Sequence, residues 1–70
     1  SNCVINSRAL IEHDAVVGQH CHVSTSATIN GAARIGDGCF LGSGSVVREG
    51  VTVADNSFVP MGERVIADQG

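Results

Sequence analysis

The sequence predicts an all-β fold, a parallel β-helix with three flat sides, and two regular spacings support this prediction. A branched aliphatic residue occupies every sixth position from residue 5 to residue 65, namely Ile5, Ile11, Val17, Val23, Ile29, Ile35, Leu41, Val47, Val53, Val59 and Val65. The fourth place after most of these residues is small: Ala9, Ala15, Cys21, Ala27, Ala33, Cys39, Ser45 and Ser57, with Val51 and Glu63 as the larger members. Such an unbroken internal repeat predicts a solenoid.

Each six-residue unit is expected to form one short strand followed by a corner. Successive side chains of a strand point to opposite faces, so Cys21 and Val23 both point inward while His22 between them points outward. Three units return the chain to its start after 18 residues, and neighbouring coils then lie about 4.8 Å apart. A helix would need a period of 3.6, which is absent from this chain of nine Gly. We expect about four 18-residue coils in a triangular prism.

The cysteines give an internal check on the length of a coil. Cys3, Cys21 and Cys39 follow one another at intervals of one predicted coil, and Ser57 continues the series, so they are expected to form one inward column. Parallel stacked side chains do not offer the dihedral angle that a disulfide needs, and the spacing is not that of a zinc finger. We expect the cysteines to act as small apolar core residues, which fits a reducing cytoplasm.

Size and charge limit the possible partners. Residues 1–70 are expected to form one thin domain, which buries little surface alone and would gain from oligomerisation. The net charge of −3 and the absence of Lys argue against nucleic acid or an anionic membrane as a partner. The sequence shows no signal-peptide pattern and no transmembrane run. Phe40 and Phe58 are one predicted coil apart and both should point outward, so we expect a covered surface and a homotrimer.

Three histidines, His13, His20 and His22, lie within ten residues. His13 is expected at a corner between Glu12 and Asp14, and His22 in the middle of a side. They are half a coil apart and therefore on opposite sides of the prism, so a site that uses both must lie between subunits. The residues alone leave three interpretations: surface histidines without a role, a metal triad, or a general base that removes a proton from a hydroxyl or amine.

Gly31 supports the general base. It follows His13 by one predicted coil and should stack directly over it at the same corner. A glycine there leaves the backbone N–H accessible to a ligand. A base with an amide donor one coil away provides the two groups that acyl transfer needs, one for the proton and one for the oxyanion. A plain tight corner is the alternative explanation of Gly31.

The stretch Ile11-Glu12-His13-Asp14-Ala15-Val16-Val17-Gly18, with His22-Val23-Ser24 and Gly31, resembles one acyltransferase family. It is similar to the left-handed β-helix domain of bacterial sialic-acid O-acetyltransferases and UDP-amino-sugar N-acetyltransferases. The resemblance extends through Ile35-Gly36-Asp37-Gly38-Cys39-Phe40-Leu41-Gly42 and Gly44-Ser45-Val46-Val47. It implies a left-handed coil and acetyl-CoA as acyl donor, without a metal. It also implies a sugar or nucleotide-sugar acceptor and an active site between subunits of a trimer.

By position, the resemblance implies that His13 is the catalytic base, Asp14 its acidic neighbour and His22 a second active-site histidine. Gly31 corresponds to the amide that binds the thioester carbonyl, and Ser43 and Met61 to backbone contacts of the pantetheine arm. Two departures are visible, because the family's N-terminal Rossmann-like domain and its Gly-x-Pro-Ala ending are both absent. We therefore expect a fragment of a longer chain. The alternatives are a non-catalytic trimerisation module and a zinc protein similar to gamma-type carbonic anhydrases.

Overall fold

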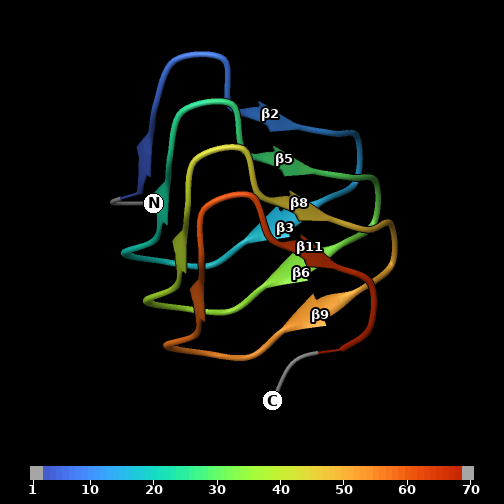
Figure 1. Cartoon of the computed structure of the whole chain (residues 1–70). Helices are drawn as coiled ribbons and strands as arrows, with labels where there is room; N and C mark the ends of the chain where they lie inside the picture. The colour runs from blue at the N-terminus through green and yellow to red at the C-terminus, as the bar shows by residue number, and fades with distance from the viewer. Residues whose placement is uncertain (1–2, 69–70) are drawn as a thin grey trace.

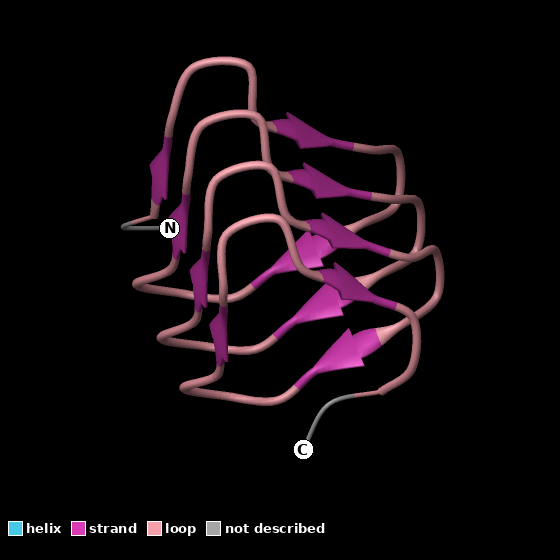
Figure 2. Ribbon diagram, in the orientation of Figure 1, coloured by secondary structure: helices cyan, strands magenta, loops and turns pink. Residues whose placement is uncertain are grey.

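The computed structural model describes residues 3–68 and contains strands joined by turns, without a helix in that range. Each strand is two residues long: β1 (Val4–Ile5), β2 (Leu10–Ile11), β3 (Val16–Val17), β4 (His22–Val23), β5 (Thr28–Ile29), β6 (Arg34–Ile35), β7 (Phe40–Leu41), β8 (Val46–Val47), β9 (Thr52–Val53), β10 (Phe58–Val59) and β11 (Arg64–Val65). Figure 1 shows the chain winding through three sides per coil, and Figure 2 shows one short strand on each side. None of the described residues forms a helix that could cross a membrane.

The strands form three parallel sheets, one for each side of the prism. We call β1-β4-β7-β10 the first sheet, β2-β5-β8-β11 the second and β3-β6-β9 the third. Every pairing joins residues that are one predicted coil apart in the chain, as in Val4 with His22 and His22 with Phe40. The predicted coil length and the predicted left-handed parallel β-helix are thereby confirmed. The described coils number three complete turns and two sides of a fourth.

The core is the column of inward side chains that the six-residue repeat predicts. From the second coil onward every aliphatic of the repeat is buried, and Val23, Ile29, Leu41, Val47 and Val53 are fully buried. Small inward residues such as Ala27 and Ala33 lie between them and let the three sheets approach one another. The narrow core thus takes one large and one small side chain from each side.

The corners are tight turns with a left-handed residue in the third place. We call residues 6–9, 24–27, 42–45 and 60–63 the first corner, 12–15, 30–33 and 48–51 the second, and 18–21, 36–39 and 54–57 the third. Residues with positive φ recur every six positions: Arg8, Asp14, His20, Ser26, Ala32, Gly38, Gly44, Gly50, Asn56 and Gly62. A positive φ at this place is the mark of a type II turn. The turn therefore imposes backbone strain wherever the residue is not glycine.

The third corner is joined between coils by side chains. The thiol of Cys21 donates to the Gly36 carbonyl at 3.0 Å, and the thiol of Cys39 donates to the Ala54 carbonyl at 3.1 Å. The three cysteines are thiols, stacked in the inward column that the sequence predicts. Burial raises the pKa of Cys21, a hydrogen bond with the Cys39 backbone partly opposes this rise, and the neighbouring Cys3 thiol adds to it.

Two aspartates link the outside of the same corner. The Asp37 carboxylate accepts the Gln19 N–H, and the Asp55 carboxylate accepts the Asp37 N–H, both at 2.8 Å. Gly18 and Gly36 leave room for these carboxylates, because a β-carbon at either position would overlap the carboxylate and the backbone of the next coil.

The two ends of the prism differ in how they cover the core. The inward side chains of the first coil are open to solvent, with Ile5 45% and Ile11 36% exposed. In the last coil Val59 and Val65 are buried. At that end Asp68 folds back, and its carboxylate accepts the Thr52 N–H at 2.9 Å. The N-terminal end is therefore the open end of the described structure.

Candidate functional site

His13 lies at the second corner, in the turn between β2 and β3. The Ala15 N–H donates to the Glu12 carbonyl at 3.2 Å and closes the turn, and Asp14 takes the left-handed place with a φ of 64°. Glu12, His13 and Asp14 are all exposed. No hydrogen bond or ion pair within residues 3–68 joins the His13 ring to either acid. Glu12 and Asp14 thus flank His13 in the chain but do not fix the orientation of its ring.

Gly31 lies directly over His13 in the next coil, as its spacing predicts. The Ala32 N–H donates to the His13 carbonyl at 3.4 Å, and the Gly31 carbonyl accepts from the Gly50 N–H at 3.1 Å. A β-carbon on Gly31 would meet only the His13 carbonyl oxygen, at 3.3 Å. The Gly31 N–H itself has no hydrogen-bond partner among the described residues. It is an available donor one coil from the His13 side chain.

His22 lies on the first sheet, in β4. Its Nε2 is 3.3 Å from Asn6 Nδ2, an amide nitrogen that can only donate. In this arrangement Nε2 accepts, so the neutral ring carries its proton on Nδ1. The ring also lies against Phe40, with centroids 5.0 Å apart, and Phe40 stacks on Phe58 at 5.2 Å. The predicted outward aromatic column is confirmed, and we call His22, Phe40 and Phe58 the aromatic ladder.

Within one chain the structure separates these residues into two places. His13 and Gly31 share the second corner, whereas His22 belongs to the first sheet, on the opposite side of the prism. His20 lies at the third corner, where it takes a left-handed φ of 58°. Only a second copy of the chain could bring His22 close to His13.

Ser43 and Met61 form a third group, at the first corner. The Gly62 N–H donates to the Ser43 carbonyl at 2.9 Å, so these two turns stack as expected. Met61 is 79% exposed. This corner is not the one that holds His13 and Gly31. The two groups could line one cleft only if different subunits supply them.

The comparison with known families concerns the scaffold. Residues 32–65 match the family model described as the hexapeptide repeat of succinyl-transferase. The match covers just under half of the chain and agrees with the observed fold, a β-helix of six-residue repeats. The matched stretch runs from β6 to β11 and begins after His13, His22 and Gly31, so it does not bear on those residues. No curated protein matches the sequence.

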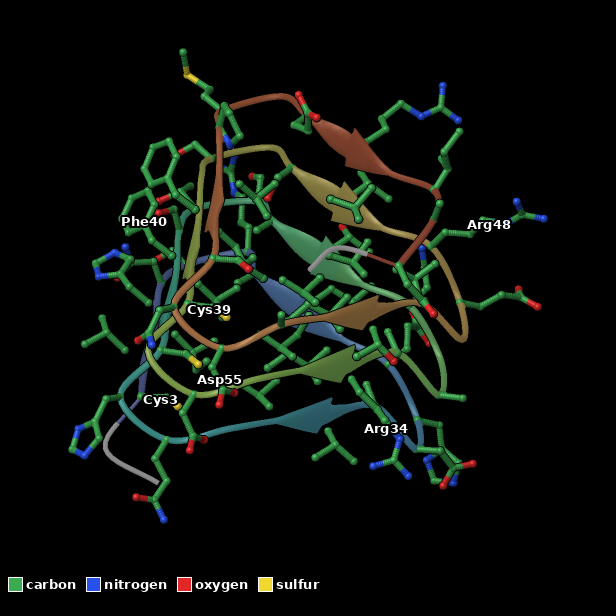
Figure 3. The ribbon with its side chains drawn as sticks, turned by 90° about the horizontal axis from the view of Figure 1, so that it is seen from below. Cys3, Arg34, Cys39, Phe40, Arg48 and Asp55 are labelled. Atoms are coloured by element: carbon green, nitrogen blue, oxygen red, sulfur yellow. The ribbon has the colours of Figure 1, made fainter. Side chains whose placement is uncertain are left out.

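The β-helix has a surface hollow, lined by both polar and apolar side chains, that the sequence analysis missed. A cavity of about 210 Å³ is lined by Asn30, Val46, Arg48, Arg64, Val65 and Ile66, next to the second corner. A neighbouring hollow of about 410 Å³ lies beyond Arg48, along residues 49–51 and 66–68. Figure 3 shows Arg34 and Arg48 on the side of the prism opposite Phe40. The signal was available, because Arg48 is two coils after Glu12 and must lie on the same corner as His13.

The arginines near this corner of the β-helix have no acidic partner. No ion pair involves Arg34, Arg48 or Arg64 within residues 3–68, and all three are exposed. The Asn30 amide donates to the Val47 carbonyl at 3.1 Å, which leaves its oxygen available at the edge of the cavity. Guanidinium groups bind phosphate oxygens well because their planar fork supplies several donors. The cavity is thus suited to an anion.

The histidines do not converge on a metal site in one chain. Among the described residues, no three His, Cys, Asp or Glu side chains come close enough together to ligate one ion. The chemistry that one chain offers at the second corner is an exposed imidazole, an available amide donor and unpaired guanidinium groups.

Proposed function

We propose that this chain is the β-helical domain of a homotrimeric acetyltransferase of the cytoplasm. It transfers the acetyl group of acetyl-CoA to a hydroxyl or amine of a sugar or nucleotide-sugar. The observation that carries the proposal is the placement of the available Gly31 N–H one coil from His13 at the second corner. The match to a hexapeptide repeat of succinyl-transferase supports acyl transfer as the class of reaction.

His13 acts as the general base. Its neutral imidazole takes the proton of the acceptor hydroxyl or amine as the oxygen or nitrogen attacks the thioester carbonyl. The carbonyl oxygen becomes an oxyanion, which the Gly31 N–H stabilises by a hydrogen bond. The carbon–sulfur bond then breaks, and the proton held on His13 passes to the leaving thiolate. The products are the acetylated sugar and CoA with a thiol.

Asp14 assists through its negative charge, which stabilises the positive charge that develops on the imidazole during proton transfer. The structure shows no direct contact between the two side chains, so the effect acts through space and solvent. We therefore assign Asp14 a smaller contribution than His13, of the size expected for an exposed ion pair.

His22 of the partner subunit completes the site. Asn6 holds Nε2 of the ring as an acceptor, so Nδ1–H is left as a donor toward the substrate. Since cyclic symmetry can place the second corner of one subunit beside the first sheet of the next, this donor can reach the carbonyl held by Gly31. The active site is incomplete in a single chain.

Acetyl-CoA lies along the prism axis in this proposal. Its thioester is at Gly31, and its phosphates occupy the cavity between Arg48 and Arg64, farther along the second corner. Each coil advances about 4.8 Å, so Arg48 lies about one coil and Arg64 just under two coils beyond Gly31 along the prism axis. Backbone near Ser43 and Met61 contacts the pantetheine arm from the partner subunit.

The test is calorimetric titration of the chain with acetyl-CoA, followed by subunit mixing. Saturable binding of acetyl-CoA is expected, weakened by Arg48→Ala and unaffected by His20→Ala, which removes a histidine at another corner. In an assay of acetyl transfer, His13→Ala and His22→Ala each abolish most activity. Mixing the two variants restores part of it, because some interfaces then combine an intact His13 with an intact His22. Near-normal turnover by His13→Ala would remove the base assignment.

A non-catalytic trimerisation module is the second candidate. Outward apolar residues support it, since the exposed fractions of the side chains range from 49% to 67% in Val4, Leu10, Val16 and Phe58. Such a module would assemble but would not bind acetyl-CoA. A zinc enzyme of the gamma-type carbonic anhydrase kind is the third candidate, and stoichiometric zinc in elemental analysis of the purified protein would identify it.

A further inference from the structure

We propose that Phe40 of the partner subunit closes the acyl end of the donor site and limits the transferred group to a short acyl chain. This inference rests on the proposed function, because it concerns the thioester held between His13 and Gly31. Phe40 is a specificity residue here and takes no part in proton transfer.

The register of the coils leads to Phe40. Strand pairs are offset by one coil throughout, so a residue's height along the prism axis follows from its number. His13 and His22 are half a coil apart in sequence, which is about 2.4 Å in height. Rotation about a threefold axis parallel to the prism leaves heights unchanged. The same offset that places His22 of the partner subunit beside His13 therefore places Phe40 of the partner subunit beside Gly31.

The two surfaces that meet at this height are complementary. Gly31 and Ala32 present nearly bare backbone at the second corner, with nothing but the His13 carbonyl near the missing β-carbon of Gly31. The Phe40 ring projects outward from the first sheet and lies between two other rings, with centroid distances of 5.0 Å to His22 and 5.2 Å to Phe58. It is 36% exposed, whereas Phe58 is 67% exposed. A ring packed on both faces has little freedom to move aside.

This arrangement predicts the shape of the acyl pocket. In this arrangement the thioester oxygen accepts from the Gly31 N–H, and the acyl carbon is placed across the interface, on the side of the aromatic ladder. An acetyl methyl fits against the Phe40 ring as an apolar contact, whereas further methylenes would meet the ring. Phe58 is one coil farther along and faces the residues near Glu49, so it contacts the arm of the donor and not the acyl group.

The experiment measures the dissociation constants of acetyl-CoA and butyryl-CoA by calorimetry for the wild-type chain, Phe40→Ala and Phe58→Ala. We expect the wild type to prefer acetyl-CoA about tenfold or more, and Phe40→Ala to lose about tenfold of that preference. Phe58→Ala is the matched control, since it removes the same ring from the same ladder one coil away. Its preference ratio should equal that of the wild type, even where both affinities weaken.

Light scattering on each variant shows whether the assembly is retained. Where Phe40→Ala dissociates, Phe40→Leu keeps an apolar side chain and should show a smaller shift in the same direction. An unchanged ratio in an assembled Phe40 variant, or an equal shift in Phe58→Ala, overturns the inference and leaves the acetyltransferase proposal intact. A wild-type chain that binds neither thioester overturns the acetyltransferase proposal itself, and the acyl pocket with it.

Discussion

Ser45 and Ser57 occupy equivalent inward places in the repeat, yet their hydroxyls differ in hydrogen bonding. The Ser57 hydroxyl donates to the Ala54 carbonyl at 2.7 Å, while Ser45 Oγ is buried and has no partner within residues 3–68. A buried polar atom without a partner costs more than it contributes. We expect Ser45→Ala to raise the free energy of unfolding by about 1 kcal/mol and Ser57→Ala to lower it by about as much. Urea unfolding at one protein concentration measures both, and equal effects of the two variants would contradict this prediction.

The inward column of cysteine thiols leads to a prediction about the reactivity of each cysteine. Burial raises the pKa of Cys21, so at neutral pH less of it is the reactive thiolate. Its thiol and that of Cys39 are also covered, whereas Cys3 is only partly buried. We expect iodoacetamide to alkylate Cys3 first in the native protein and all three at similar rates in urea, as followed by peptide mass spectrometry. Faster labelling of Cys21 than of Cys3 in the folded chain would contradict the inward column.

Among the elements, the corners differ from one another in how much room they leave for a side chain. At Gly50 φ is 72° and a β-carbon would meet nothing within 4 Å, so only the backbone conformation opposes a side chain. At Gly36 a β-carbon would overlap the Asp55 carboxylate and lie 2.7 Å from its backbone nitrogen. We expect Gly50→Ala to cost about 1 kcal/mol of stability and Gly36→Ala about 3 kcal/mol. The two urea midpoints measure this difference, and a larger loss for Gly50→Ala would show that the coils are not stacked as described.

The strands were predictable because each is fixed by one inward aliphatic and its small neighbour. The coil length also predicted that Gly31 lies over His13 and Phe58 over Phe40. The links at the third corner were not predictable, because a period does not say that Asp37 and Asp55 turn their carboxylates back to the coil before them. The arginine cavity was missed for a related reason. Its residues come from a corner and a sheet face, and the repeat period alone does not say which outward side chains line one hollow.

At the scale of the whole molecule, the outward apolar residues bear on assembly. Phe58, Leu10 and Val16 are each 49% exposed or more, on three different sheets. Phe58 also stacks on Phe40, and adjacent outward rings of this kind favour a covered surface. We expect the chain to elute with a mass three times that of its 7.2 kDa monomer in light scattering. Phe58→Glu should shift the population toward smaller species, because it places a charge on the aromatic ladder, and a wild-type mass of one chain would remove the trimer.

The open N-terminal end provides a second test on the whole molecule. Ile11 and Ile29 are partners on the second sheet, one coil apart and chemically identical, but Ile11 is 36% exposed and Ile29 is fully buried. Truncation of a buried isoleucine removes more buried apolar area than truncation of an exposed one, and it leaves a cavity in the core. We expect Ile29→Ala to lower the free energy of unfolding by about 4 kcal/mol and Ile11→Ala by only about 1 to 2 kcal/mol. Losses of equal size in urea unfolding would mean that another surface covers the first coil in solution. The end would then be an interface, and dilution of the protein should weaken Ile11's contribution selectively, because only contacts between molecules depend on concentration.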